Sequence, residues 1–397
     1  MNFTGCSTTG FYIALDYLID EVKSNNNSIS IFRAVSYLRD CRSFMVRTQK
    51  QYMLLYNCLF DYIVGGRKYL SYDMITQYNH LNSRNDLTGE KYISEEYCLL
   101  SKYSSSQSFG DVVAAMLPSN KSKNRPSDYI NAIYVDGYHQ SNSFILTQTP
   151  LQETLVDFWR MIYEQGVSTI VMMDDDQMRD ESCATYWPQT ADDSQLSSHG
   201  DGNPHCVFGN FIVKLIEEKA DDVAVSRHVT LSHSAHPDEM ERHVTQFQMV
   251  GWPLKQSKPP KTSLAIIQLI EKVEEWQRLV VSSYNQTVSS PVVVHCLDGA
   301  VHSGLYVATS IICEKMAAQN RVNIFLTVKE INHRRKEVVS SLHQYKYLHR
   351  VLWDYIHVKL LHQVKENSKS EEITSAERES GYNSQPLEMY TSSSEED

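Results

Sequence analysis

The sequence predicts a layered α/β or α+β domain, and three observations lead to that prediction. Apolar and β-branched runs of strand length alternate with longer stretches of helical periodicity between residues 129 and 360. A β-branched run, a glycine-containing loop and a helical stretch follow one another over residues 292–316. A helical pattern from the first 64 residues returns after residue 303, which indicates that one structural unit occurs twice.

The strands and helices of the main domain follow from these patterns. We expect strands at 129–135, 144–147, 169–173, 211–217 and 292–295. We expect helices at 151–165, 262–280, 303–318, 324–335 and 342–360. Nearer the N-terminus, helical periodicity covers 12–22, 31–39 and 49–63, and Gly65-Gly66 marks the end of the last of these helices.

The stretch from Val292 to Gly304 combines the features of an anion-binding cradle. A β-branched strand ends at Cys296, a short loop follows, and a helix begins. The N–H groups of such a loop and the helix N-terminus converge on one point, where the helix dipole favours negative charge. The thiolate of Cys296 would be stabilised there, although Asp298 works against this effect. The predicted cradle consists of His295, Leu297, Asp298, Gly299, Ala300, Val301, His302 and Gly304 around Cys296.

Composition and charge narrow the class of protein. The chain has 397 residues, of which 42% are hydrophobic and 21% charged, as in ordinary globular proteins. Of the net charge of −11, residues 366–397 contribute −7, so neither part has the concentrated basic face of a nucleic-acid binder. No apolar run approaches the roughly 18 residues of a membrane helix, and the N-terminus lacks the pattern of a signal peptide. Eight cysteines without CxxC pairs predict reduced thiols and no zinc site, and no cofactor is expected.

The repeat defines the expected domains. Residues 9–14 match residues 303–308, and Ile31-Phe32, Gln51-Tyr52 and Asp61-Tyr62-Ile63 match residues 293 positions further on. We interpret 1–64 as the C-terminal helical remnant of a first copy, 65–85 as a linker, 86–365 as the second copy, and 366–397 as a disordered acidic tail rich in Ser and Glu. Because the remnant cannot bury its apolar stripes alone, we expect the chain to be a fragment or truncated isoform of a longer one.

Seven short blocks in this order resemble the classical protein tyrosine phosphatase domain over residues 85–365. They begin at Asp128, Asp136, Thr147, Asp157, Cys183, Gly251 and His295. The resemblance implies a central twisted mixed sheet flanked by helices, with the strand–loop–helix stretch as its phosphate-binding cradle. The tandem arrangement implies a receptor-type protein, with the second copy as its membrane-distal domain, cytoplasmic and joined to the membrane only through a parent receptor chain. The pairing of the Gly251 and His295 blocks is most similar to the MAM-containing kappa/mu group.

The resemblance also assigns catalytic roles to three residues that the chain retains. Cys296 stands at the position of the nucleophile that forms a thiophosphate intermediate. Ser303 stands at the position of the hydroxyl that is hydrogen-bonded to the thiolate. Gln344 stands at the position of the residue that places the hydrolytic water.

Other positions depart from the family's pattern. His302 stands where the family has an arginine that grips two phosphoryl oxygens in a bidentate fork, which an imidazole cannot offer. Leu254, which follows Trp252 and Pro253, stands where the family has its general acid. Asp298 adds a negative charge that would repel a phosphate dianion.

These departures predict a catalytically inactive domain that acts as a binding or regulatory module in phosphotyrosine signalling. Its expected partners are phosphotyrosine proteins or a partner phosphatase domain. One alternative is a weakly active phosphatase that uses Cys296. Another is a redox-sensing regulator, which requires a pKa of the Cys296 thiol well below about 8.5.

Several further residues have a structural and a functional interpretation. Asp174-Asp175-Asp176 is interpreted as a solvated turn rather than a metal site, and His205-Cys206 as part of a loop. We expect core positions for Trp159, Tyr186, Trp187 and Trp252. In the tail, Ser392, Ser393 and Ser394 each have an acid three residues later, as in sites of acid-directed kinases, and Tyr382 and Tyr390 are candidate docking tyrosines.

Overall fold

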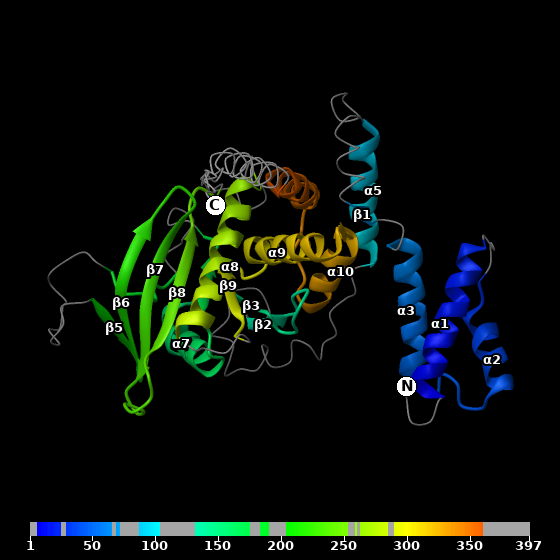
Figure 1. The fold of residues 1–397 in the computed structure, drawn as a ribbon, viewed down its shortest axis with the longest axis horizontal. Helices are drawn as coiled ribbons and strands as arrows, with labels where there is room; N and C mark the ends of the chain where they lie inside the picture. The colour runs from blue at the N-terminus through cyan, green and yellow to red at the C-terminus, as the bar shows by residue number, and fades with distance from the viewer. Residues whose placement is uncertain are drawn as a thin grey trace, which may run out of the picture. The chain divides into compact units, whose positions relative to one another are not determined.

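A computed structural model of the protein describes ten segments of the chain (Figure 1). They are residues 6–24, 29–65, 69–71, 87–103, 132–174, 183–189, 204–252, 259, 263–284 and 290–359. Contacts divide the chain into two units, Met1–Leu352 and Trp353–Asp397. In the second unit the described residues, 353–359, are helical, and the architecture below is that of the first unit. No helix in these segments is long and apolar enough to cross a membrane.

The first unit is built on a mixed sheet of eight strands. In spatial order they are β2 (Ala132–Val135), β3 (Phe144–Gln148), β9 (Val292–Cys296), β4 (Thr169–Met172), β8 (Arg242–Met249), β7 (Ala224–His233), β6 (Phe211–Ala220) and β5 (His205–Phe208). The four strands β3, β9, β4 and β8 pair in parallel, and the remaining pairs are antiparallel. The mixed sheet with flanking helices confirms the predicted fold class.

The antiparallel half of the sheet was only partly predicted. Strands β2, β3, β4, β6 and β9 overlap the expected runs, whereas β5, β7 and β8 were not foreseen. The loop expected at His205-Cys206 is wrong, because both residues lie in β5 and Cys206 pairs with Val213 of β6. The sequence does not predict β7 and β8, because polar side chains such as Arg227 and Gln246 interrupt their apolar pattern. These side chains are nevertheless buried.

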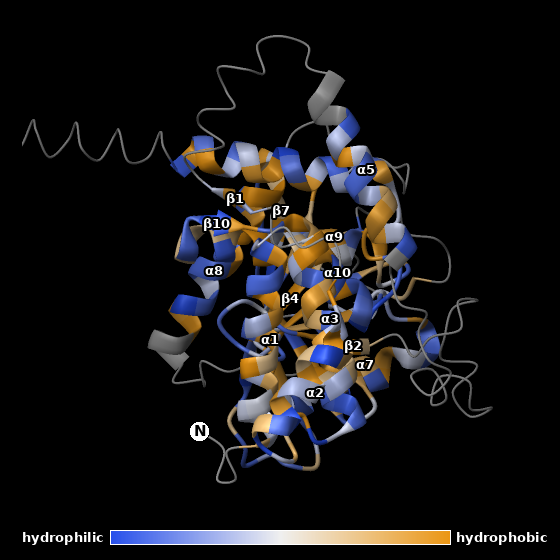
Figure 2. Cartoon of the chain, turned by 90° about the vertical axis from the view of Figure 1, so that its right-hand side faces the viewer, coloured by the Kyte–Doolittle hydropathy of each residue, from blue (hydrophilic) through white to orange (hydrophobic). Residues whose placement is uncertain are grey.

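Helices cover both faces of the sheet, and strand alternation decides which face each site residue meets. Val293 packs in the core cluster that includes Phe158 of α7 (Leu155–Glu164). Because successive side chains of a strand point to opposite faces, His295 lies on the face of α7 and Cys296 on the other. That other face carries α9 (Val301–Gln319), which packs on β9 and β3 and contacts α8 (Leu264–Tyr284). Hydrophobic colour is concentrated around β4 and α9 (Figure 2).

The first unit also contains elements outside the large sheet and the helices named above. They are η2 (Gln152–Thr154), α10 (Ile324–Arg334), α5 (Leu87–Tyr103), and a two-stranded sheet of β1 (Leu70–Ser71) with β10 (Arg321–Val322). Helix α5 was not predicted, and residues 66–68 and 72–85 of the expected linker lie outside the described segments. The four aromatic residues expected in the core, Trp159, Tyr186, Trp187 and Trp252, are all buried.

Three N-terminal helices agree with the sequence prediction. They are α1 (Ser7–Lys23), α2 (Ile31–Cys41) and α3 (Gln49–Val64), which ends at Gly65. They bury a common cluster that includes Leu18, Val35 and Leu55. Several of their other apolar side chains stay exposed: Phe32 is 70% exposed, whereas its repeat counterpart Phe325 in α10 is 0% exposed. The matching phenylalanine is thus fully covered in α10 and largely exposed in α2.

This difference predicts unequal effects of one substitution at the two repeat positions. Phe325→Ala removes a fully buried ring and should lower the free energy of unfolding by about 3–5 kcal/mol. Phe32→Ala, the matched control, should change it by no more than about 0.5 kcal/mol. Urea denaturation of both variants measures the two values. Equal losses would show that the ring of Phe32 is covered in the folded protein.

Candidate functional site

The site lies where β3, β9 and β4 end side by side. The N–H of Thr149, just after β3, donates to the carbonyl oxygen of Cys296 at 2.8 Å, and the N–H of Met173, just after β4, donates to that of His295 at 2.9 Å. Both bonds extend the parallel ladders beyond the strands. The carboxyl edge of parallel strands is the usual place for a ligand site in α/β proteins. Cys296 and the loop after it are therefore flanked by Thr149 and Asp174.

The loop after β9 is shorter than the sequence suggested. Helix α9 begins at Val301, so His302, Ser303 and Gly304 belong to its first turn. Gly299 turns the loop with a φ of +65°, and a Cβ at this position would lie 2.4 Å from the backbone nitrogen of Gln148. Only glycine satisfies both conditions. The predicted strand–loop–helix geometry is present.

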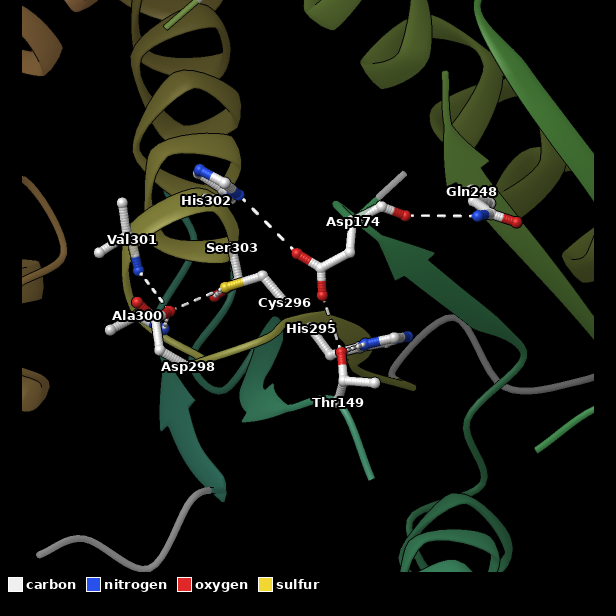
Figure 3. Close-up of polar contacts among 10 residues, drawn as sticks. All are labelled: Thr149, Asp174, Gln248, His295, Cys296, Asp298, Ala300, Val301, His302 and Ser303. Atoms are coloured by element: carbon white, nitrogen blue, oxygen red, sulfur yellow. Dashed lines mark hydrogen bonds and ion pairs between the residues drawn. The ribbon is translucent and has the colours of Figure 1, made fainter. Parts of the chain in front are cut away.

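The carboxylate of Asp298 lies inside the loop. Its Oδ1 accepts hydrogen bonds from the N–H groups of Ala300 at 2.9 Å and Val301 at 3.0 Å (Figure 3). Its Oδ1 also lies 3.1 Å from Sγ of Cys296. From outside the loop, Nη2 of Arg335 donates to the carbonyl oxygen of Asp298 at 2.9 Å. The backbone donors at the start of α9 therefore already bind an anionic group.

Cys296 is buried, and its surroundings favour the neutral thiol. Burial raises the pKa of the Cys296 thiol well above its ordinary value, and the charges of Asp298 and then Asp174 raise it further. The hydroxyl of Ser303, 3.2 Å from the sulfur, acts in the opposite direction but is the weaker influence. The expected stabilisation of the thiolate is therefore wrong, because the loop dipole is outweighed by desolvation and two carboxylates.

His302 is buried and its ring is directed toward Asp174 (Figure 3). Its Nδ1 lies 3.8 Å from Oδ1 of Asp174, and its ring packs on Trp252 with centroids 5.2 Å apart. Pro253 and Leu254, the rest of the expected acid loop, lie outside the described residues. Asp174 itself is 0% exposed, so the interpretation of this residue as part of a solvated turn is wrong.

A chain of hydrogen bonds connects Asp174 with the histidine before the cysteine. The Thr149 hydroxyl donates to Oδ2 of Asp174 at 2.9 Å and lies 2.9 Å from Nδ1 of His295. Since its only proton is used on the carboxylate, Nδ1 of His295 must be the donor in the second contact. The other ring nitrogen, Nε2, then accepts from the hydroxyl of Tyr186 at 2.7 Å. The network thus fixes one neutral tautomer of His295.

The chain continues to a buried guanidinium and returns to its start. Nε2 of Gln246 donates to the hydroxyl oxygen of Tyr186 at 2.6 Å. Arg227 donates to Oε1 of Gln246 at 3.1 Å and of Gln248 at 2.7 Å, and Gln248 donates to the carbonyl oxygen of Asp174 at 3.3 Å. The donors along the branch through Gln246 point from the cation of Arg227 toward the carboxylate of Asp174, and those along the branch through Gln248 point toward its backbone carbonyl oxygen. Such an ordered network rigidifies the floor of the site.

Sequence reasoning missed this network. The signal was available in part: Asp174 directly follows the predicted strand 169–173, as Cys296 directly follows 292–295. The two strands were not known to be neighbours, so the residues were not connected. Gln344, the expected water-placing residue, is buried, and its Oε1 accepts from the N–H groups of Ser340 at 2.9 Å and Ser341 at 3.2 Å. Within the described segments no group of three or more His, Cys, Asp or Glu could hold a metal ion.

The raised pKa of Cys296 predicts low reactivity toward an alkylating reagent, because only the thiolate reacts. In folded protein at about pH 8, iodoacetamide should modify the exposed Cys41 and Cys98 and leave Cys296 unmodified. Mass spectrometry of peptides distinguishes the three sites within one sample. Modification of Cys296 faster than of the two exposed thiols would contradict the inferred environment and favour the redox-sensing alternative.

Comparison with known proteins agrees with the geometry. The family model for protein-tyrosine phosphatase matches residues 1–61 and 111–354. Receptor-type tyrosine-protein phosphatase epsilon of Mus musculus is 30% identical over 383 residues, which cover 89% of this chain and 51% of that protein. Receptor-type tyrosine-protein phosphatase alpha of Mus musculus is 28% identical over 376 residues, covering 89% and 42%. Tyrosine-protein phosphatase 69D of Drosophila melanogaster is 29% identical over 375 residues, covering 88% and 24%. The chain therefore spans about half or less of the length of these relatives.

Proposed function

Because the chain belongs to the protein-tyrosine phosphatase family, we propose that it is a catalytically inactive member that acts as a binding or regulatory module in phosphotyrosine signalling. One observation carries this proposal. The sulfur of Cys296 is buried beside the Asp298 carboxylate, which lies 3.1 Å away and accepts its S–H. A nucleophilic cysteine must attack as the thiolate, and this environment disfavours that form.

The residue at the arginine position supports the same proposal. A guanidinium offers a planar fork of N–H groups to two phosphoryl oxygens. An imidazole can direct only one N–H group toward a phosphoryl group, because its two ring nitrogens point away from each other. The His302 ring is directed toward Asp174, with Nδ1 3.8 Å from its Oδ1. Loss of a donor aimed at the developing charge costs about 10²–10³-fold in rate.

The general-acid position adds a further loss. Leu254 stands there in the sequence, and the absence of a general acid costs about 10²–10⁴-fold. Such losses are not additive, yet each acts on a different part of the reaction: attack, charge stabilisation and departure of the phenolate. Together they leave little turnover.

The wider biological setting is also part of the proposal. The domain belongs to the cytoplasmic portion of a receptor-type protein with two phosphatase domains, of the MAM-containing kappa/mu group, and residues 1–64 come from the first domain. The two separate matches to one family model, at 1–61 and 111–354, support the tandem arrangement. The relatives named alpha and epsilon support the receptor type. The partners are phosphotyrosine proteins or another phosphatase domain, and Ser392, Ser393 and Ser394 are phosphorylated in the tail.

A phosphatase assay on the full chain tests the proposed inactivity. With para-nitrophenyl phosphate and a phosphotyrosine peptide, the wild type should give the same rate as Cys296→Ser, because neither offers a thiolate. The triple substitution His302→Arg, Leu254→Asp and Asp298→Ala serves as the positive control, since it restores the fork and the acid and removes the carboxylate. Turnover by the wild type that disappears in Cys296→Ser would refute the proposal.

A weakly active phosphatase is the second candidate. It is favoured by the retention of Cys296 with the Ser303 hydroxyl 3.2 Å from its sulfur, and by the presence of Gln344. This candidate predicts that the wild type approaches the rate of the triple variant, so the same experiment distinguishes the two functions.

A further inference from the structure

The carboxylate of Asp298 holds the position at which the loop would bind an oxyanion. Two backbone N–H groups, of Ala300 and Val301, donate to a single oxygen of this side chain (Figure 3). These groups form the N-terminus of α9, a helix of 19 residues, where the dipole favours an anion. The S–H of Cys296 completes the set of donors to the same oxygen at 3.1 Å. Two backbone donors of the loop and the S–H of Cys296 are therefore already in use.

The backbone on the C-terminal side of Asp298 is fixed, which keeps the carboxylate close to the N–H groups from which it accepts. Gly299 packs against β3 closely enough that a Cβ would lie 2.4 Å from the nitrogen of Gln148 and 2.5 Å from the carbonyl carbon of Thr147. Arg335 holds the carbonyl oxygen of Asp298 at 2.9 Å. The Asp298 side chain reaches the N–H groups of Ala300 and Val301, two and three residues later, without any movement of the loop backbone.

A second carboxylate gives independent evidence that the pocket no longer suits phosphate. Oδ1 of Asp174 is buried and has no hydrogen-bond partner among the described residues. Nδ1 of His302, a basic group, lies 3.8 Å away. An unpaired, buried acceptor is stabilised by a donor or a cation and repels an anion. The groups on this side of the loop therefore favour the opposite charge from that of a phosphate.

We infer that Asp298 is an internal ligand of the cradle and closes it to phosphate monoesters, so that the domain binds its partners without reading phosphate at this loop. The inference rests on the proposed function as a binding module and narrows its partners to those recognised through other surfaces. Asp298 could weaken phosphate binding in two ways, by occupying the backbone donors or by its negative charge, and the inference assigns the effect to occupancy.

Calorimetric titration of the full chain with orthophosphate tests the inference with two substitutions. Asp298→Ala removes the carboxylate altogether and should bind orthophosphate at least tenfold more tightly than the wild type. Asp298→Asn keeps an oxygen that can accept from Ala300 and Val301 but has no charge, and it should bind as weakly as the wild type. Asp238→Ala removes an exposed acid elsewhere and controls for the change in net charge. Thermal melting checks that each variant folds. Asp298→Gly, which also leaves the N–H groups of Ala300 and Val301 without a side-chain acceptor and costs less stability at a capping position than Ala, replaces Asp298→Ala if that variant does not fold.

Three results would overturn the inference. They are orthophosphate binding by the wild type equal to that of Asp298→Ala, no binding by the folded Ala or Gly variant, and equal binding by the Asn and Ala variants, which would leave charge as the sole cause. Phosphate binding by the wild type without turnover would overturn this inference alone. Cys296-dependent turnover would instead overturn the proposed function.

Discussion

The pairing of β9 with β3 on one side and β4 on the other is the constraint on which the rest of the site depends. It places Cys296 opposite Gln148 and His295 opposite Met172 in the two parallel ladders. The chain leaves all three strands at one edge, so residues far apart in sequence meet there. The alternation of β9 then separates their environments: His295 enters the hydrogen-bonded network on the face of α7, and Cys296 meets the loop on the face of α9.

The preserved geometry and the changed chemistry are physically compatible. A loop that converges on backbone N–H groups needs an acceptor for them whether or not it binds a ligand, because buried donors without partners are costly. In this chain Asp298 supplies that acceptor from within the loop. The loop can therefore keep its conformation although it binds no anion. It also needs neither a cation that binds the anion nor a reactive thiolate. A binding module can retain the shape of an active site on this basis.

The sequence predicts those parts of the structure whose signals lie within one short stretch of the chain. The β-branched run of Val292 to Val294 and the glycine of the turn made the strand, the loop and the position of Cys296 predictable. The burial of Asp174 was not, because it depends on β4 being a neighbour of β9, and periodicity does not give strand order. For the same reason β7 and β8 escaped prediction. Their polar side chains, Arg227 and Gln246 among them, are buried because they form hydrogen bonds with each other and with neighbours such as Tyr186.

A crystal structure of the full chain grown with excess orthophosphate would test the central claim most directly. If Asp298 is an internal ligand of the cradle, its Oδ1 will still accept from the N–H groups of Ala300 and Val301, with no anion inside the loop. A phosphate bound to those N–H groups, with the Asp298 side chain turned out of the loop, would contradict it.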